Sequence, residues 1–241
     1  MRTNLPPQVE ATSECSILLR FGEHIQQSCS DRVHAAVRAL QSPVIPGIVE
    51  LIPGYATLAV HYDPALWIDA NASRSPAQRI TDAMLERLAN SLEEDSETRA
   101  RLIEIPVCYD PELGEDLLES ARTLGIEVDQ LITRHADGDY RVAMLGFAPG
   151  FPYLLGLDPG LALPRRSQPR LRVPAGSVAI GGSQTGIYPT DLPGGWHLIG
   201  RTPLRLFDPC RQPPQLVGAG DRLRFIAVSR KQFDAMVEDP E

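Results

Sequence analysis

The sequence predicts two domains of different class: an α+β domain of the split-βαβ, ferredoxin-like type, followed by a mainly-β domain. Two observations lead to this. The first hundred residues alternate between apolar residues at every second position and apolar residues at every third or fourth, the periods of strands and helices. From Tyr140 onward, short β-like runs are separated by glycine and proline, as in antiparallel barrels and sandwiches. We expect the domains to span 1–95 and 96–241.

The N-terminal elements follow from these periods. They are a strand at 15–21, a helix at 31–40, two strands within 48–63 and a helix at 76–92. Ser30 or Asp31 can cap the first helix, and Pro76 suits the first turn of the second. Pro53 and Gly54 predict a type II turn, in which Gly54 takes positive φ. The order predicts a split βαβ sandwich, which we expect a strand within 101–110 to close.

The second domain follows a charged stretch at 93–99, which we interpret as a linker. Two helices are expected, at 111–125 and 128–136. The β-like runs after them are YRVAMLGF, SVAIGG, HLIGRTPLRLF and DRLRFIAVS.

Composition limits the functional classes. The 241 residues carry a net charge of −8, which disfavours non-specific nucleic-acid binding, and Lys231 is the only lysine. The four cysteines form no C-x-x-C pair and the five histidines show no ligand spacing, so no metal site is expected. The N-terminus has no apolar signal core, and no run approaches the ~20 apolar residues of a membrane helix. We expect a soluble, cytoplasmic protein with no nucleic-acid or membrane partner.

The segment IGGSQTGIYPTDLPGGWHLIGRTP (180–203) holds six glycines, three prolines and only two charged residues. Gly181 and Gly186 have P-loop spacing, but Ile187 stands where the phosphate-binding lysine would be, so a P-loop is rejected. Ser183 lacks the closing glycine of a nucleophile elbow. The density of glycine and proline, with apolar anchors such as Trp196, instead predicts rigid loops on a β scaffold. Such loops either form a binding surface or serve only as barrel corners.

Three motifs in this half resemble a known family. They are GFAPGFPYLLGL (146–157), PRRSQPRLRVPAGSVAIGG (164–182) and QTGIYPTDLPGGWHLIGRTP (184–203). Together they are similar to the B subunit of bacterial 5-oxoprolinase (PxpB), a family also called KipI-like or allophanate hydrolase subunit 1. The resemblance covers roughly residues 10–230. It implies an α+β domain followed by a cyclophilin-like β-barrel, and it gives no ground for prolyl isomerase activity.

The resemblance also implies partners and a reaction. The partners are a C-type subunit with a related barrel (PxpC/KipA-like) and an A-type subunit (PxpA/LamB-YcsF-like). The assembled enzyme would open 5-oxoproline to L-glutamate with hydrolysis of ATP, and this chain alone would be inactive. ATP is needed because an unactivated lactam is a poor electrophile, and phosphorylation of the amide oxygen would let water attack.

Candidate site residues lie within and beside these motifs. Arginine binds carboxylate and phosphate oxygens through its planar fork, so Arg172 and Arg201 are candidates for a ligand or partner surface, whereas Arg165 and Arg170 are expected to pair with the chain's own carboxylates. The backbone amides of Gly181, Gly182 and Gly186 can form an anion nest. Directed hydrogen bonds are expected from Tyr153, Gln184, Thr185, Tyr188 and His197. The catalytic candidates are Arg201, His197 and Tyr188. The candidates for substrate or anion binding are Arg172, Gly181, Gly182, Gln184, Thr185, Gly186 and Tyr153.

Two alternatives stay open at this point. Some KipI-like proteins are thought to inhibit a sensor histidine kinase, and the older family name suggests a urea or allophanate substrate. Gene neighbours of the A and C types would favour the hydrolase, and a neighbouring kinase would favour the inhibitor.

Overall fold

The computed structural model describes residues 6–69, 73–91 and 100–238. The chain divides into two compact units, residues 1–99 and 100–241. The expected linker at 93–99 lies outside the described residues.

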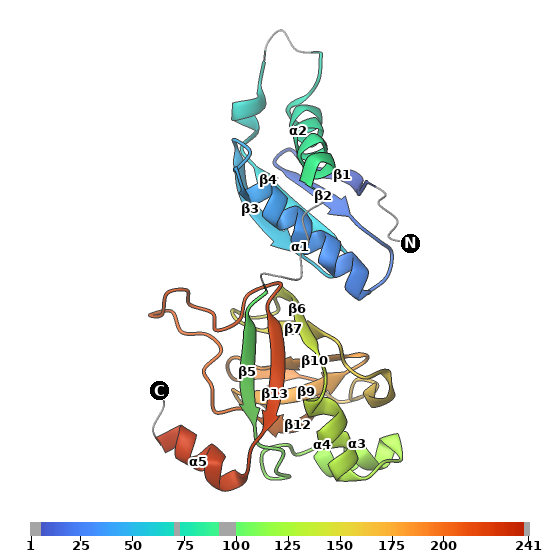
Figure 1. The fold of residues 1–241 in the computed structure, drawn as a ribbon, viewed down its shortest axis with the longest axis vertical. Coiled ribbons are helices and arrows are strands. Elements are labelled where there is room, and N and C mark those ends of the chain that lie inside the picture. The colour runs from blue at the N-terminus through green and yellow to red at the C-terminus, as the bar shows by residue number, and fades with distance from the viewer. Residues whose placement is uncertain (1–5, 70–72, 92–99, 239–241) are drawn as a thin grey trace. The chain divides into compact units, whose positions relative to one another are not determined.

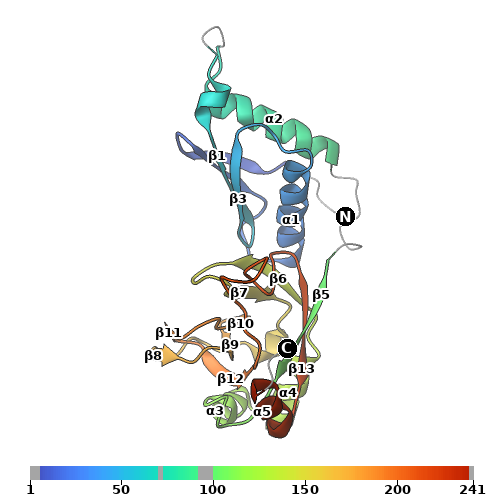
Figure 2. The same cartoon turned by 90° about the vertical axis from the view of Figure 1, so that its left-hand side faces the viewer.

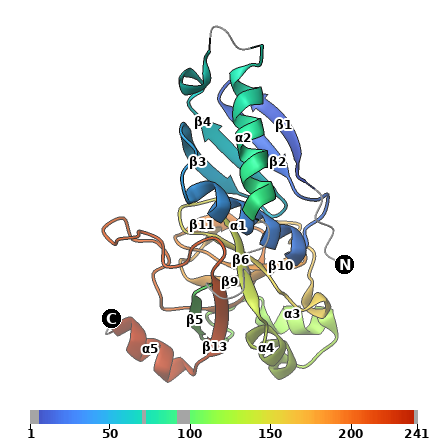
Figure 3. The ribbon, with the colours of Figure 1, turned by 45° about the horizontal axis from the view of Figure 1, so that its top comes forward.

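The first unit is a four-stranded antiparallel sheet with two helices on one face (Figure 2). Its strands are β1 (Gln8–Ser13), β2 (Ser16–Arg20), β3 (Ile48–Pro53) and β4 (Thr57–Tyr62), in the order β1-β2-β4-β3. Its helices are α1 (Gln27–Gln41) and α2 (Pro76–Ser91), with a short 3₁₀ turn η1 (Pro64–Trp67) before α2 (Figures 1 and 3). β4 lies between β2 and β3, so β2-α1-β3 is a split βαβ unit as predicted.

The core of this unit lies between the sheet and the helices. Ile17, Leu19, Leu58 and Val60 point from β2 and β4 toward buried side chains of α1 and α2. α1 begins four residues earlier than predicted, because its extra turn is stabilised by burial of Cys29 rather than by a cap. The type II turn prediction is wrong. Gly54 does not take positive φ, and the hairpin is closed by its N–H donating to Thr57 O over 2.7 Å.

One predicted strand belongs to the other unit. The strand expected within 101–110 is β5 (Leu102–Val107), and it pairs in parallel with β13 (Arg222–Ala227) of the second unit. The place beside β2 is taken by β1, which forms a hairpin with it. The sequence pattern gives only a weak sign of β1, because Val9 and Ala11 are its only apolar residues and all six of its residues are exposed.

The second unit is a nearly closed barrel of seven strands in the order β12-β9-β10-β7-β6-β13-β5 (Figure 1). Besides β5 and β13, these are β6 (Tyr140–Leu145), β7 (Pro152–Leu155), β9 (Ser177–Gly181), β10 (Gln184–Ile187) and β12 (His197–Arg201). Cys108, directly after β5, exchanges two backbone hydrogen bonds with Arg201 at the end of β12, at 2.9 and 3.0 Å. The first and last strands of the sheet therefore meet. Both domain types predicted from the sequence are confirmed.

Helices and a ribbon flank the barrel. α3 (Leu117–Leu124) packs beside β12 and α4 (Val128–Ala136) beside β13, and Leu117 and Leu131 from them enter the barrel core. The ribbon of β8 (Arg170–Val173) and β11 (Leu192–Gly194) stands apart from the main sheet (Figure 2), and η3 (Pro159–Leu161) and α5 (Arg230–Glu238) complete the unit. α3 is shorter than the predicted helix at 111–125, and Gly114, in the turns before α3, lies against the backbone of Ile199 with no room for a Cβ.

No helix in the described parts of the chain is both long and apolar enough to cross a membrane.

Candidate functional site

Loops from all three sequence motifs line one cavity of about 520 Å³ in the barrel unit. They are the loop after β6, the turn before β9, the segment after β10 and the segment after β12. The walls are mostly apolar. The lining residues are Pro149, Ala175, Gly176, Pro189, Thr190, Thr202, Pro203, Leu204, Arg205, Phe207 and Pro209. Arg205 is the one ionisable side chain among them.

Two glycines let these loops pack closely. Gly176 has φ +78°, and a Cβ there would lie 2.4 Å from Thr202 O. Gly150 has φ +81°, and a Cβ there would lie 2.8 Å from the Cβ of Phe207. Residues with a side chain rarely adopt that backbone conformation, and a Cβ would not fit at either contact. Gly176 also donates its N–H to Tyr188 O (2.7 Å) and accepts from Thr202 N–H (2.9 Å), so three of the four loops are joined by backbone hydrogen bonds.

Arg211 holds the backbone of the cavity rim around Arg205 through hydrogen bonds. The Arg211 guanidinium donates to the carbonyls of Leu206 and Pro214 at 3.2 and 3.1 Å, and more weakly to Arg205 O. Arg205 itself is 70 % exposed and pairs with Asp208 over 3.3 Å. The Arg205 side chain is therefore a solvent-accessible cation on a fixed backbone.

Arg201, the leading catalytic candidate, lies next to the cavity without lining it. It directly precedes Thr202, and its Cγ would be 3.3 Å from a Cβ at Gly176. Its Nε is buried and has no hydrogen-bond partner among the described residues. Burial of the guanidinium lowers the pKa of Arg201, and the more distant carboxylates of Glu115 and Asp191 oppose that shift. Arg201 is therefore a partly buried cation beside the loops.

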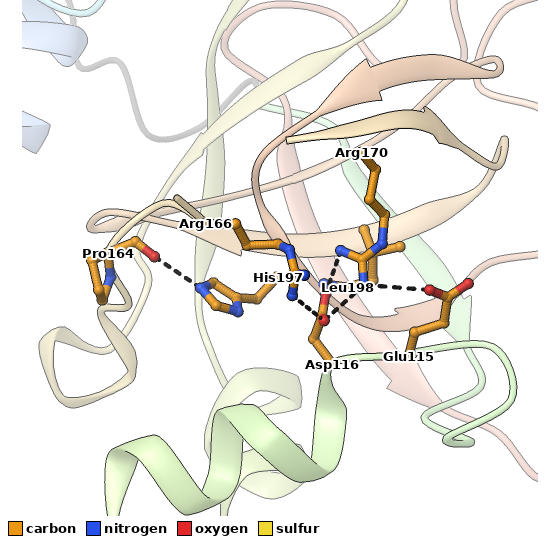
Figure 4. Close-up of polar contacts among 7 residues, drawn as sticks. All are labelled: Glu115, Asp116, Pro164, Arg166, Arg170, His197 and Leu198. Carbon is orange, nitrogen blue, oxygen red and sulfur yellow. Dashed lines mark hydrogen bonds and ion pairs between the residues drawn. The ribbon is translucent and has the colours of Figure 1, made fainter. Parts of the chain in front are cut away.

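Asp116 forms a buried ionic cluster that sequence reasoning missed (Figure 4). Its carboxylate accepts hydrogen bonds from Arg166 (2.7 Å), from two nitrogens of Arg170 (both 2.8 Å) and from the Leu198 N–H (2.8 Å). Burial alone would raise the pKa of Asp116, but the bonds from Arg170 and Leu198 outweigh it, so the pKa is lowered. The cluster ties the start of α3 to β12 and β8. The expectation that Arg170 pairs within the chain is confirmed.

His197 is held beside this cluster (Figure 4). Its Nε2 donates to Pro164 O over 2.8 Å, since a carbonyl can only accept. Its Nδ1 is buried with no hydrogen-bond partner in the described chain. The ring therefore fastens the 164–170 segment to the start of β12, and its second nitrogen faces the protein interior.

Thr185 belongs to a buried chain of hydrogen bonds inside the barrel. Its hydroxyl donates to Ala179 O (2.9 Å), so it accepts from His135 Nε2 (3.0 Å), and His135 Nδ1 then accepts from the Tyr109 hydroxyl (2.8 Å). His135 is fully buried and stacks on Phe225, with ring centroids 4.6 Å apart. Burial lowers the pKa of His135 to about 3. Thr185 therefore stabilises the core rather than facing a ligand.

The remaining candidates on β9, β10 and the following segment are also packed. Gly182 takes φ +64° and exchanges hydrogen bonds with Leu163, so its N–H is not available to an anion nest. A Cβ on Gly181 would meet Trp196 and one on Gly186 would meet Pro152 O. Tyr188 is 2 % exposed within an aromatic cluster. Two further candidates, Tyr153 and Gln184, are half-buried.

Arg172 lies on the exposed ribbon and pairs with Asp191, its Nε donating over 2.6 Å. This pair joins β8 to the segment before β11. Phe147 is the one non-glycine residue with positive φ (68°) among those described, and its ring is 60 % exposed. Sequence reasoning did not single out the cavity residues Arg205 and Thr202. The sequence motifs did indicate where the cavity lies, because the segments PAG (174–176) and RTP (201–203) belong to two of the loops that line it.

The described residues contain no group of three or more histidine, cysteine or acidic side chains placed to hold a metal ion.

Comparisons with known proteins define the family. Residues 7–217 match the family model "Carboxyltransferase domain, subdomain C and D". The chain is 43 % identical to the B subunit of 5-oxoprolinase from Bacillus subtilis, covering 96 % of this chain and 97 % of that protein. It is 46 % identical to the B subunit of 5-oxoprolinase from Escherichia coli O157:H7, covering 88 % and 92 %.

Solved structures agree with this. TTHA0988 has a TM-score of 0.73 at 41 % identity over 89 % of this chain, which spans 40 % of that longer protein. PH0987 from Pyrococcus horikoshii has a TM-score of 0.55 at 39 % identity, covering 94 % of this chain and all of the other. The urea amidolyase of K. lactis, at 19 % identity and a TM-score of 0.72, shares the fold. The chain therefore belongs to the carboxyltransferase subdomain C and D family and, within it, to the family of 5-oxoprolinase B subunits.

Proposed function

We propose that this chain is the B subunit of an ATP-dependent 5-oxoprolinase, which opens 5-oxoproline to L-glutamate together with an A-type and a C-type subunit. The observation that carries the proposal is the identity of 43 % and 46 % to two named B subunits over nearly their whole lengths. The convergence of all three motifs on one cavity adds a physical reason, because binding sites commonly lie in concave surfaces formed by loops on a rigid scaffold.

The chain's own contribution is binding and charge. The cavity walls, mainly proline, leucine and phenylalanine, suit the apolar face of a small ring. The partly buried guanidinium of Arg201 lies beside this site, where a cation held by the protein stabilises developing negative charge more strongly than a fully hydrated cation would. A lactam acquires such charge on its oxygen when its carbonyl carbon is attacked.

ATP would supply the activation of the amide oxygen, but the described residues do not form a triphosphate site. The P-loop lysine is absent from the sequence, and Gly182 N–H is already bonded to Leu163 O. The cavity offers one cation, and that cation is shared with Asp208. We therefore propose that the assembled complex uses ATP and that partner subunits supply most of the phosphate contacts.

Reconstitution tests the proposed function. The chain is purified with its A-type and C-type partners, and glutamate release from 5-oxoproline is followed with and without ATP. Turnover that requires all three chains and ATP is the expected result. Full activity without this chain would refute the proposal, and turnover of urea-derived substrates instead of 5-oxoproline would select the urea-linked alternative. Inhibition of a sensor histidine kinase by the chain alone would select the kinase-inhibitor alternative.

A further inference from the structure

We propose that the motif-loop cavity binds the carboxylate of the substrate, with Arg205 as the residue that recognises it. This inference rests on the proposed function and makes it more specific, because it assigns a ligand class and an orientation to one cavity. Three features of the cavity support it: its composition, its rigidity and its charge.

The composition selects a small organic acid with an apolar body. Eight of the eleven lining residues are proline, alanine, glycine, leucine or phenylalanine, and the polar ones are Thr190, Thr202 and Arg205. Thr202 is 3 % exposed, and its hydroxyl oxygen accepts the Leu204 N–H over 3.2 Å, which leaves its hydrogen available to donate. A nearly apolar cavity with a few directed polar groups is the usual form of a small-molecule site.

The rigidity indicates a preformed site. Gly176 and Gly150 hold the walls at backbone contact distance, and backbone hydrogen bonds join three of the four loops. Arg211 holds the backbone next to Arg205 by donating hydrogen bonds to the carbonyls of Leu206 and Pro214. A site that is ordered before binding avoids the entropy cost of ordering loops when the ligand arrives.

The charge selects one carboxylate rather than a polyphosphate. Among the described residues, Arg205 is the one ionisable residue that lines the cavity and no acidic side chain lines it. Arg205 is already partly neutralised by Asp208 at 3.3 Å. A single carboxylate matches the planar guanidinium fork, whereas three or four phosphate charges would need several cations. Because the carboxylate of 5-oxoproline is attached to the ring, its capture at the rim would direct the apolar ring carbons toward the proline and phenylalanine walls.

The test separates Arg205 from the lactam chemistry. Arg205→Gln is assayed in the reconstituted complex against Arg224→Gln, an exposed arginine of β13 that pairs with Glu104 over 3.6 Å outside the cavity. We expect Arg205→Gln to raise the KM for 5-oxoproline about 10-fold or more, with kcat and the KM for ATP nearly unchanged. The inhibition constant of 2-pyrrolidinone, the same lactam without the carboxylate, should not change. Arg224→Gln should match the wild type.

Other outcomes overturn the inference. An unchanged KM for 5-oxoproline would do so while leaving the proposed function intact. A raised KM for ATP would place a phosphate at Arg205, and loss of assembly by Arg205→Gln alone would make the rim a subunit contact. If the wild-type complex turns over no 5-oxoproline, the proposed function fails, and NMR of the full chain decides the inference separately. Shifts of the Gly176 and Thr202 amides on adding 5-oxoproline, absent in Arg205→Gln, would support it, and no shifts would overturn it.

Discussion

Mild acid should destabilise the barrel unit through a single buried residue, His135. Its Nδ1 accepts from Tyr109 and its Nε2 donates to Thr185, and the bond from Tyr109 requires the neutral form of the ring. A proton on Nδ1 would break the bond from Tyr109 and place a charge against Phe225 in the core. Replacing His135 with glutamine removes the titrating group and keeps a polar side chain.

The magnitude follows from the two pKa values. The pKa of His135 is about 3 in the folded chain because of burial, against 6.5 for an ordinary histidine. Between these values the unfolded chain binds more protons than the folded chain, so the free energy of unfolding falls as the pH falls. Each pH unit in this window costs about 1.4 kcal/mol. From pH 8 to pH 5 the histidine should therefore cost about 2 kcal/mol.

Urea unfolding of the full chain at several pH values measures this. A Trp67→Phe background leaves Trp196, in the barrel unit, as the sole tryptophan, so its fluorescence reports that unit. His135→Gln should be less stable at pH 8, and its stability should fall by about 2 kcal/mol less than that of the wild type between pH 8 and pH 5. His24→Gln, at an exposed position, controls for removal of a histidine. The reasoning is refuted if wild type and His135→Gln lose the same stability over this interval.

Three further predictions concern the cluster and the loops. Asp116→Asn should lower the free energy of unfolding in urea by about 3 kcal/mol, because it leaves Arg166 and Arg170 without their buried partner, and a loss under about 1 kcal/mol would contradict this. Because the pKa of Asp116 is lowered in the folded state, its contribution to stability is present above its ordinary pKa of 3.8 and is lost as the pH falls below that value. Arg201→Ala should lower turnover of the reconstituted complex about 10-fold or more with assembly intact, whereas Arg172→Ala, an exposed pair, should change it less than about 3-fold; equal losses would remove the special role of Arg201. Gly176→Ala should destabilise the barrel unit by about 2 kcal/mol, from the strain of positive φ and the contact with Thr202 O; thermal unfolding that matches the wild type would show that the turn relaxes.

Much of the fold was predictable because period and punctuation are local signals. α2 begins at Pro76 as expected, and the β-like runs after Tyr140 became β6, β9, β12 and β13. The prediction that β5 closes the first unit is wrong because its partner β13 is more than a hundred residues away, and nothing in residues 101–110 specifies which sheet they join. Pairing across such a distance is decided by packing and not by local pattern.

The site was predictable in part. The expectation of rigid loops around 180–203 stays a prediction, and close packing in that segment supports it: a Cβ on Gly194 would lie 2.2 Å from the Tyr188 hydroxyl oxygen, and one on Gly200 would lie 2.9 Å from Cys108 O. The individual side chains were harder to assign, because residue type does not reveal which face of a strand points inward. Thr185 faces His135 in the core, and Asp116 gave no sequence signal because both of its arginine partners lie 50 or more residues away.

The pairing of β5 with β13 also determines when the barrel can fold during translation. During translation, β5 is synthesised more than a hundred residues before β13, the strand with which it pairs. The backbone bridge of Cys108 likewise cannot form until Arg201 has been synthesised. Until translation nears the C-terminus, β5 offers an open hydrogen-bonding edge, which is a hazard for aggregation. A fragment that stops before Arg222 should leave that edge permanently open, so premature termination late in the gene would yield an insoluble product and not a shortened functional protein.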